Sequence, residues 1–241
     1  MTEKPADNLT PAAPQELALR DLGRMRYGPA FELQKELNQA VVDGEAPPTL
    51  LLVEHEPVIT VSQRRSAGQH IVASKDRLAR MGIEVHETDR GGDITYHGPG
   101  QLVAYPIVQM SPLGFNLGRY MRALEQVVID TLARFGVEGQ RDPGATGVWV
   151  EQKSAPGGTE LAKVCAMGVR VRKNTTMHGL ALNVTTDLAH FATIIPCGLA
   201  GRPVTSLEKL LNASCPGMDE VKAELVRAMN EHLTPSAEPA E

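Results

Sequence analysis

The order of strand-like and helix-like segments limits the possible folds of this 241-residue chain more than any other feature of its sequence. Short apolar stretches typical of β-strands outnumber the segments with helical periodicity. The two types do not alternate strictly, as they must in a doubly wound parallel sheet. We therefore predict an α+β fold, with a single domain built around a mixed β-sheet.

Five segments carry the apolar periodicity or the end signals of helices. The clearest is 117–135, where apolar side chains recur every three or four residues until Gly136 stops the pattern. Ser74 fits an N-cap, and Gly44 ends an earlier apolar stripe. We expect helices at 27–42, 75–81, 117–135, 205–211 and 218–233.

The remaining apolar stretches predict strands and mark the limits of the domain. We expect strands at 49–53, 58–61, 83–86, 102–108, 148–150, 164–171 and 180–184. The Pro- and Gly-containing stretch 151–160 is typical of a loop. The polar ends, 1–15 and 234–241, predict disordered tails on either side of a domain at 16–233.

Charge and cysteine content exclude several classes of protein. A formal net charge of -5 does not suit a general nucleic-acid binder, so any acidic partner must meet a local basic patch. Three cysteines without a CxxC pair predict neither a disulfide framework nor a thiolate zinc site. Residues 1–14 lack the pattern of a signal peptide, and no apolar run approaches the ~20 residues of a membrane span. We expect a protein of the cytoplasm with no membrane partner. Thiols stay reduced in that compartment.

The glycine-rich segment Arg90–Gln101 is a candidate ligand loop. Four glycines and one proline lie among Arg, Tyr, His and Gln side chains, and glycine lets backbone approach a ligand closely. The segment matches neither the dinucleotide fingerprint nor the phosphate loop. A mobile surface turn is the alternative, although such turns are usually richer in Asn, Asp and Ser.

Two further segments place possible reactive groups. In a strand over 161–172, alternation puts Lys163 on the same face as Cys165 and Met167, although the residues alone favour a strand-end lysine reaching water. Cys197 lies between a proline and a glycine in a tight stretch that can present a thiol to a cleft. Most lone cysteines are simply buried, and Cys215 also precedes a proline. A fourth segment, Met177–Asn183, contains His178, which fits a structural histidine.

Together these segments resemble the lipoyl(octanoyl) transferase family. The stretch RGGDITYHGPGQLVAYPI is the most specific part of the resemblance, and AKVCAMGVRVR, HGLALNV and IIPCGLAGRPVTSLE follow in the family's order. The resemblance covers about 16–233. It implies the α+β fold of the biotin and lipoate protein ligases, related to class II aminoacyl-tRNA synthetases, around a mixed sheet.

The resemblance also implies roles for individual residues. Cys197 matches the nucleophile that forms an acyl-thioester, and Lys163 matches the lysine that lowers its pKa and carries its proton. Three segments match substrate-binding residues of the family, namely Arg90, Gly91, Gly92, Asp93, Ile94, Thr95, Tyr96 and His97, then Ala166, Met167 and Gly168, then Gly179, Leu180 and Ala181.

The implied reaction moves an octanoyl group from octanoyl-acyl carrier protein to a lysine of a lipoyl domain. Lipoyl domains of 2-oxoacid dehydrogenase E2 subunits and the glycine cleavage H protein are the implied acceptors. A thioester donor and a thioester intermediate need no ATP, cofactor or metal. Two alternatives stay open: an ATP-dependent lipoate or biotin ligase on the same fold, and a non-catalytic acyl-binding module.

Overall fold

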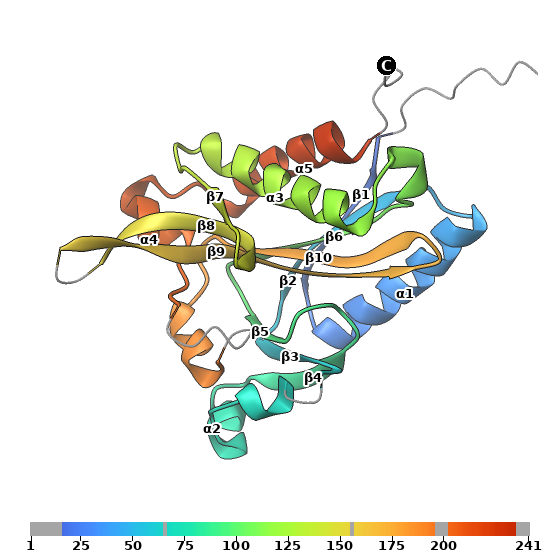
Figure 1. The fold of residues 1–241 in the computed structure, drawn as a ribbon. Coiled ribbons are helices and arrows are strands. Elements are labelled where there is room, and N and C mark those ends of the chain that lie inside the picture. Colours follow the sequence, from blue (N-terminus) through green and yellow to red (C-terminus); the bar gives the residue numbers. More distant parts are fainter. Residues whose placement is uncertain (1–15, 65–66, 155–156, 196–201, 235–241) are drawn as a thin grey trace, which may run out of the picture.

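The computed structural model describes residues 16–64, 67–154, 157–195 and 202–234, which form two mixed β-sheets with helices on their faces (Figure 1). Apart from Thr234, the two tails expected from the sequence lie outside the described residues. No helix in the described ranges is both long enough and apolar enough to span a bilayer.

The larger sheet has seven strands in the order β1-β2-β6-β10-β9-β8-β7. β1 and β2 run parallel, and the other neighbours run antiparallel. This pairing confirms the predicted mixed sheet. The strands are β1 (Ala18–Met25), β2 (Thr49–His55), β6 (Gln101–Ile107), β7 (Gln140–Asp142), β8 (Ala145–Ser154), β9 (Gly158–Arg172) and β10 (Thr175–Asn183).

A smaller sheet packs below the larger one in the order β4-β3-β5 (Figure 1). β3 (Val58–Ser62) runs parallel to β4 (Glu84–Thr88) and antiparallel to β5 (Ile94–His97). β5 therefore lies inside the glycine-rich segment that the sequence marked as a loop. The space between β5 and the larger sheet is where the candidate site lies.

Strand alternation divides the larger sheet into two buried faces. On β2, Leu50 and Leu52 pack with the helices α3 (Leu117–Ala133) and α5 (Met218–Leu233). Leu51 and Val53 point to the opposite face, which α1 (Tyr27–Asp43) covers. Figure 1 shows α3 and α5 on one side of the sheet and α1 on the other.

The helix ends follow the local signals in the sequence. Gly44 ends α1 in the left-handed conformation at φ 76°, and the Ser74 hydroxyl accepts a hydrogen bond at the start of α2 (Lys75–Arg80). Ser206 caps α4 (Leu207–Leu211) in the same way. The five helices expected from the sequence are confirmed. Short 3-10 turns complete the described chain at η1 (Ala67–His70), η2 (Ser111–Leu113), η3 (Leu188–Thr193) and η5 (Asn212–Ser214).

The sequence predicted the strands less completely than the helices. β1 and β7 were not expected, because both lie at sheet edges and carry mostly exposed or half-buried side chains. The expected loop at 151–160 is wrong, since β8 and β9 stay paired up to Ser154 and Gly158. This hairpin projects from the body of the protein, so its side chains lack the buried-face alternation that marks a strand (Figure 1).

Candidate active site

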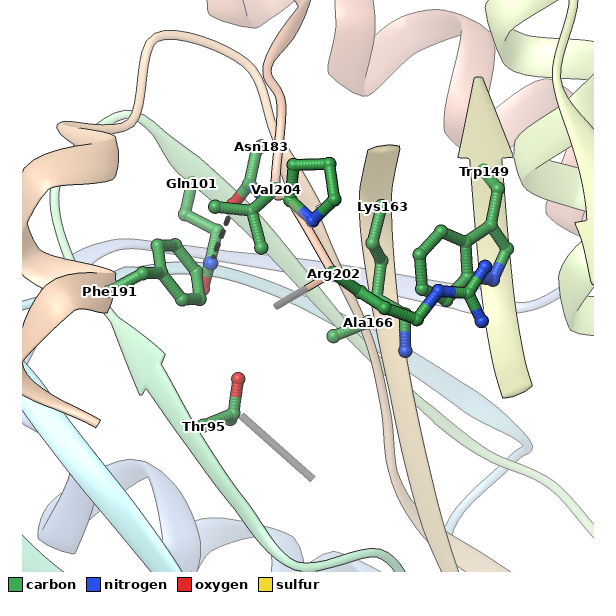
Figure 2. Close-up of a pocket in the computed structure, with 10 residues that line it drawn as sticks. Thr95, Gln101, Trp149, Lys163, Ala166, Asn183, Phe191, Arg202 and Val204 are labelled. Atoms are coloured by element: carbon green, nitrogen blue, oxygen red, sulfur yellow. Dashed lines mark hydrogen bonds between the residues drawn. The ribbon is translucent and has the colours of Figure 1, made fainter. Parts of the chain in front are cut away.

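Two adjoining pockets lie between the larger sheet and β5. They share Thr95 and Ala166. The first pocket is lined by Thr95, Gln101, Trp149, Lys163, Ala166, Asn183, Phe191, Arg202, Pro203 and Val204 (Figure 2). The second is lined by Tyr27, Arg90, Gly92, Thr95, His97, Val103, Tyr105, Ala166, Met167, Gly168, His178, Gly179, Leu180 and Ala181.

A β-bulge turns Lys163 toward the first pocket. Val148 pairs with Cys165, but the next residue, Trp149, pairs with Lys163, so Val164 is the extra residue of β9. Val164 and Cys165 both pack in the core beneath α3 and α5. The expectation that Lys163 shares a face with Cys165 is therefore wrong. Simple alternation within one strand does not reveal a bulge, because the bulge depends on the pairing with the neighbouring strand.

Backbone and side-chain contacts fix the Lys163 ammonium group. Its Nζ donates to the Thr146 carbonyl at 2.9 Å and stands 4.6 Å from the centre of the Trp149 ring. The Lys163 backbone N–H donates to the Pro203 carbonyl, and its carbonyl accepts from the Thr205 N–H, both at 2.9 Å. Lys163 thus connects β9 to the chain that follows the segment bearing Cys197.

A second cation, Arg202, lies against the same indole. Its guanidinium carbon stands 3.7 Å from the Trp149 ring centre, and Figure 2 shows Lys163 and Arg202 beside this ring. Arg202 also forms an ion pair with Asp142. Its hydrogen bond lowers the pKa of the Asp142 carboxyl. Two cations and one carboxylate thus lie in this part of the site, and a cation favours a thiolate or an oxyanion.

Buried hydrogen bonds fix the polar side chains at the back of the site. The Gln101 amide nitrogen donates to Asn183 Oδ1 at 2.8 Å and to the Tyr96 carbonyl at 3.3 Å. Its Oε1 therefore accepts from His97 Nδ1 at 2.7 Å, which makes Nδ1 the protonated ring nitrogen. Burial, with a smaller contribution from His55, holds the pKa of His97 well below its usual value. Neutral His97 thus offers Nε2 as an acceptor.

β5 turns alternate side chains toward and away from the pockets. Thr95 and His97 line them, while Ile94 and Tyr96 pack into a separate core with Phe191. The Tyr96 hydroxyl is hydrogen-bonded to His190 Nδ1 at 2.8 Å. The sequence-based expectation that Tyr96 lines the pocket is therefore not met. Asp93, whose carboxylate lies 2.6 Å from His70 Nδ1, does not line either pocket.

Arg90 and Gly91 pack across β9. The Arg90 guanidinium donates to the Thr60 carbonyl and hydroxyl at 3.1 and 2.9 Å, and the Gly91 N–H donates to the Val169 carbonyl at 2.9 Å. A Cβ on Gly168 would come within 2.6 Å of the Gly91 carbonyl oxygen. Glycine at 168 is therefore what lets the Arg90–Gly91 backbone lie this close to the strand.

An open groove on the protein surface adjoins both pockets. It shares Lys163 and Ala166 with the first pocket, and Gly92, Ala166, Met167 and Gly168 with the second. Gly91, Arg64 and the half-exposed Leu117 also line it. Lys163 consequently lines both the first pocket and the surface groove.

The structure thus brings most of the expected site residues together. Those that line a pocket or the groove are Arg90, Gly91, Gly92, Thr95, His97, Lys163, Ala166, Met167, Gly168, Gly179, Leu180 and Ala181. Cys197 lies outside the described residues. Several lining residues went unassigned, namely Tyr27, Tyr105, Trp149, Asn183 and Arg202, because they come from separate elements and no local motif marks them.

The other two cysteines are poor candidates for a nucleophile. Cys165 is fully buried in the core, where burial raises the pKa of its thiol to about 12. Burial also raises the pKa of the Cys215 thiol. Both groups stay protonated at neutral pH, and a protonated thiol is a weak nucleophile.

Comparison with known proteins places this architecture in a family. Residues 26–230 match the family described as lipoyl protein ligase A/B catalytic domain. An octanoyltransferase of Chloroflexus aggregans is 45% identical over 214 residues, which are 88% of this chain and 93% of the relative. An octanoyltransferase of Acidobacterium capsulatum is 47% identical over 200 residues, or 80% of this chain and 79% of the relative.

Solved structures show the same fold at much lower sequence identity. A bipartite lipoate protein ligase of Thermoplasma acidophilum superposes with a TM-score of 0.68 at 18% identity, over 90% of this chain and 84% of that one. A biotin protein ligase of Aquifex aeolicus superposes with a TM-score of 0.54 at 16% identity, over 90% and 70% of the two chains. The fold is therefore that of the lipoate and biotin protein ligases, and the chain belongs to the octanoyltransferases of the lipoyl protein ligase A/B family.

Proposed function

We propose that this protein transfers an octanoyl group from octanoyl-acyl carrier protein to the lysine of a lipoyl domain, through a thioester on Cys197. The observation that carries the proposal is the placement of Lys163. Its ammonium group is fixed by Thr146 and Trp149, and Lys163 lines both the first pocket and the surface groove. The octanoyltransferases among its relatives support the same reaction.

The described residues on both sides of Cys197 support its role as the nucleophile. Before the undescribed segment 196–201, the Ile195 N–H donates to the His70 carbonyl at 2.8 Å. After it, Arg202 and Pro203 line the pocket that contains Lys163. The segment that bears Cys197 therefore leads directly into the wall of this pocket. A cation near a thiol favours the thiolate, the reactive form of cysteine.

The proposed reaction has two acyl-transfer steps. The Cys197 thiolate attacks the octanoyl carbonyl, the carrier's thiolate leaves, and a proton from Lys163 neutralises it. The acceptor lysine amine then attacks the enzyme thioester, the amide bond forms, the Cys197 thiolate leaves, and neutral Lys163 accepts the amine proton. The first step exchanges one thioester for another, and the second forms a more stable amide. The acyl donor therefore supplies the driving force without ATP.

The second pocket is suited to the acyl chain. It adjoins the Lys163 pocket at Thr95 and Ala166, and its lining includes Val103, Leu180 and Ala181. Burying about six methylenes at ~0.8 kcal/mol each contributes on the order of 5 kcal/mol to binding. The Arg90–Gly92 segment and the second and third expected substrate-binding segments border this space. We propose that they hold the chain.

The partners would then be acyl carrier protein as donor and two kinds of lipoylated protein as acceptors, 2-oxoacid dehydrogenase E2 subunits and glycine cleavage H protein. The open groove gives both a long donor arm and an acceptor lysine access to Lys163. We place the reaction in the cytoplasm, where the cysteine stays reduced.

Intact-mass measurement tests the covalent step. Wild type incubated with octanoyl-acyl carrier protein should gain one octanoyl group that hydroxylamine removes, because hydroxylamine cleaves thioesters. Cys197→Ser should gain no such adduct, whereas Cys215→Ser, the matched control, should gain it as the wild type does. An unmodified wild type beside fully acylated carrier would contradict the covalent mechanism. Octanoylation of a lipoyl domain that required octanoate and ATP would instead indicate the ligase reaction.

Arg64 offers a test of how the donor docks. It is exposed and lines the groove, whereas Arg170, another candidate for meeting the acidic carrier, is paired with Asp89. Arg64→Glu is expected to raise KM for octanoyl-acyl carrier protein about tenfold at low salt and less at high salt, because it reverses a charge facing an acidic partner. Steady-state kinetics should show an unchanged KM for octanoyl-pantetheine, which lacks the protein. Arg80→Glu, at an exposed site on α2, is the control. Equal KM changes for both variants would refute docking at Arg64.

A further inference from the structure

Four aromatic side chains lie together in the lining of the second pocket. Tyr27, His97, Tyr105 and His178 all line this pocket, and none is more than 6% exposed. Their rings lie close to one another, with centroids 6.2 Å apart for Tyr27 and His97 and 6.3 Å apart for Tyr105 and His178. Lys163 does not line this pocket. These four residues are called the ring wall below.

Hydrogen bonds hold the ring wall in place. One polar atom of each ring has a partner at 2.7 Å, namely Thr88 Oγ1 for Tyr27, Gln101 Oε1 for His97, His55 Nε2 for Tyr105 and Asp89 Oδ1 for His178. These bonds fix the orientation of the four rings, whose faces are largely carbon. Fixed rings of this kind also resist displacement by a bound chain.

His178 reaches the ring wall through an unfavourable backbone conformation. Its φ of 58° lies in the left-handed region, which is rare for a residue other than glycine in the middle of a strand. The His178 N–H donates to Gln34 Oε1 of α1 at 2.9 Å, and its ring stands 5.3 Å from Phe31. Regular alternation would turn this side chain toward α3 and α5, where its neighbour Leu180 packs. Strain of this type is usually retained where it positions a functional side chain.

The length of the pocket matches an eight-carbon chain. Ala166, shared by the two pockets, pairs with Ala181 on β10, and His178 lies three residues further along this strand. Three residues of β-strand span about 10 Å. An extended octanoyl group has seven C–C bonds of about 1.5 Å, which zigzag over roughly 9 Å. An extended octanoyl group therefore matches the distance along β10 from Ala181, beside the junction, to His178.

We propose that the ring wall is the stop that sets the acyl-chain length of this enzyme. A chain of eight carbons ends against the rings, and a longer chain must displace buried rings that are held by hydrogen bonds. The inference rests on the proposed acyl transfer and adds to it the residues that select the chain. It also assigns Asp89 and Gln34 the role of positioning His178.

Shortening the ring wall should admit longer chains. In Tyr105→Leu, the ratio of kcat/KM for dodecanoyl-acyl carrier protein to that for the octanoyl donor is expected to rise about tenfold, since each newly buried methylene contributes severalfold to binding. Calorimetry with octanoic and dodecanoic acids should show the same shift in affinity. Tyr120→Leu removes an equally buried ring on the opposite face of the sheet and should leave both ratios unchanged.

A filling variant tests the same idea without creating a cavity. Ala181→Leu adds volume between the junction and the ring wall and should shift preference toward a hexanoyl donor and hexanoic acid about tenfold. Thermal melting establishes whether each variant is folded. If Tyr105→Leu does not fold, the chain-length preference of Ala181→Leu tests the proposal. Folded variants with the wild-type chain-length profile overturn the ring wall as the stop. Fatty-acid binding by the wild type separates this result from failure of the proposed function. If the wild type prefers octanoic to dodecanoic acid but transfers no acyl group, the ring wall stands as the stop and the proposed transfer reaction is contradicted.

Discussion

Replacing Lys163 with Met is expected to lower kcat for octanoyl transfer by about a thousandfold, within the range typical of a lost acid–base group. Methionine keeps the length of the side chain but removes the ammonium group that donates to Thr146. Steady-state kinetics with octanoyl-acyl carrier protein and a lipoyl domain should show the loss mainly in kcat, because Lys163 acts on the reacting groups rather than on the acyl chain.

A second measurement separates this role from a structural one. Alkylation of Cys197 by iodoacetamide should follow a thiol pKa below about 8.5 in the wild type and a higher one in Lys163→Met, since the variant lacks the cation that stabilises the thiolate. Lys153→Met makes the same substitution at an exposed site on the β8–β9 hairpin and should change neither property. Identical alkylation profiles for Lys163→Met and wild type, with kcat retained, would remove Lys163 from the mechanism.

The sequence predicted helices better than strands because helical signals are local. The stripe that ends at Gly136 and the caps at Ser74 and Gly44 act within a few residues, so they could be recognised without knowledge of the rest of the fold. β1 is defined instead by its pairing with β2, thirty residues or so along the chain, and its own side chains are mostly exposed. No alternation marks such an edge strand.

The candidate site shows the same limit. The glycine-rich segment and Lys163 were recognised from their composition and from their resemblance to a family, but the direction in which Lys163 points depends on a bulge defined by β8. The ring wall was not foreseen at all. Tyr27 and Tyr105 come from α1 and β6 and meet only in the folded protein. Strand alternation alone would place the His178 side chain on the opposite face, because its positive φ breaks the pattern.

The buried histidines make a prediction about stability. Acidification from pH 7 to pH 4.5 is expected to lower the free energy of unfolding by several kcal/mol. Burial lowers the pKa of His55 from 6.5 to about 4. Burial is also the largest cause of the lowered pKa values of His97 and His178, although Asp89 opposes it at His178. In the unfolded chain all three imidazoles bind protons below about pH 6.5.

The sign follows from proton binding. Between pH 6.5 and the lower pKa of the folded state, the unfolded chain binds more protons than the native protein, so stability decreases as the pH falls. For His55 alone the loss is about 1.4 kcal/mol per pH unit, or about 3 kcal/mol by pH 4. Above pH 6.5 these imidazoles are neutral in both states and add no pH dependence. Because His97 and His178 belong to the ring wall, their protonation would also place charge in the lining of the second pocket.

Urea unfolding at pH 7.5, 6 and 4.5 measures this loss. His55→Gln should reduce the pH dependence below pH 6.5 by about 1.4 kcal/mol per unit relative to the wild type, even if it lowers stability at pH 7.5 by removing the hydrogen bond to Tyr105. A wild-type stability that stayed constant or rose on acidification would show that the buried histidines accept protons in the native fold. Rings that carried a charge could not then present the uncharged surface against which an octanoyl chain ends.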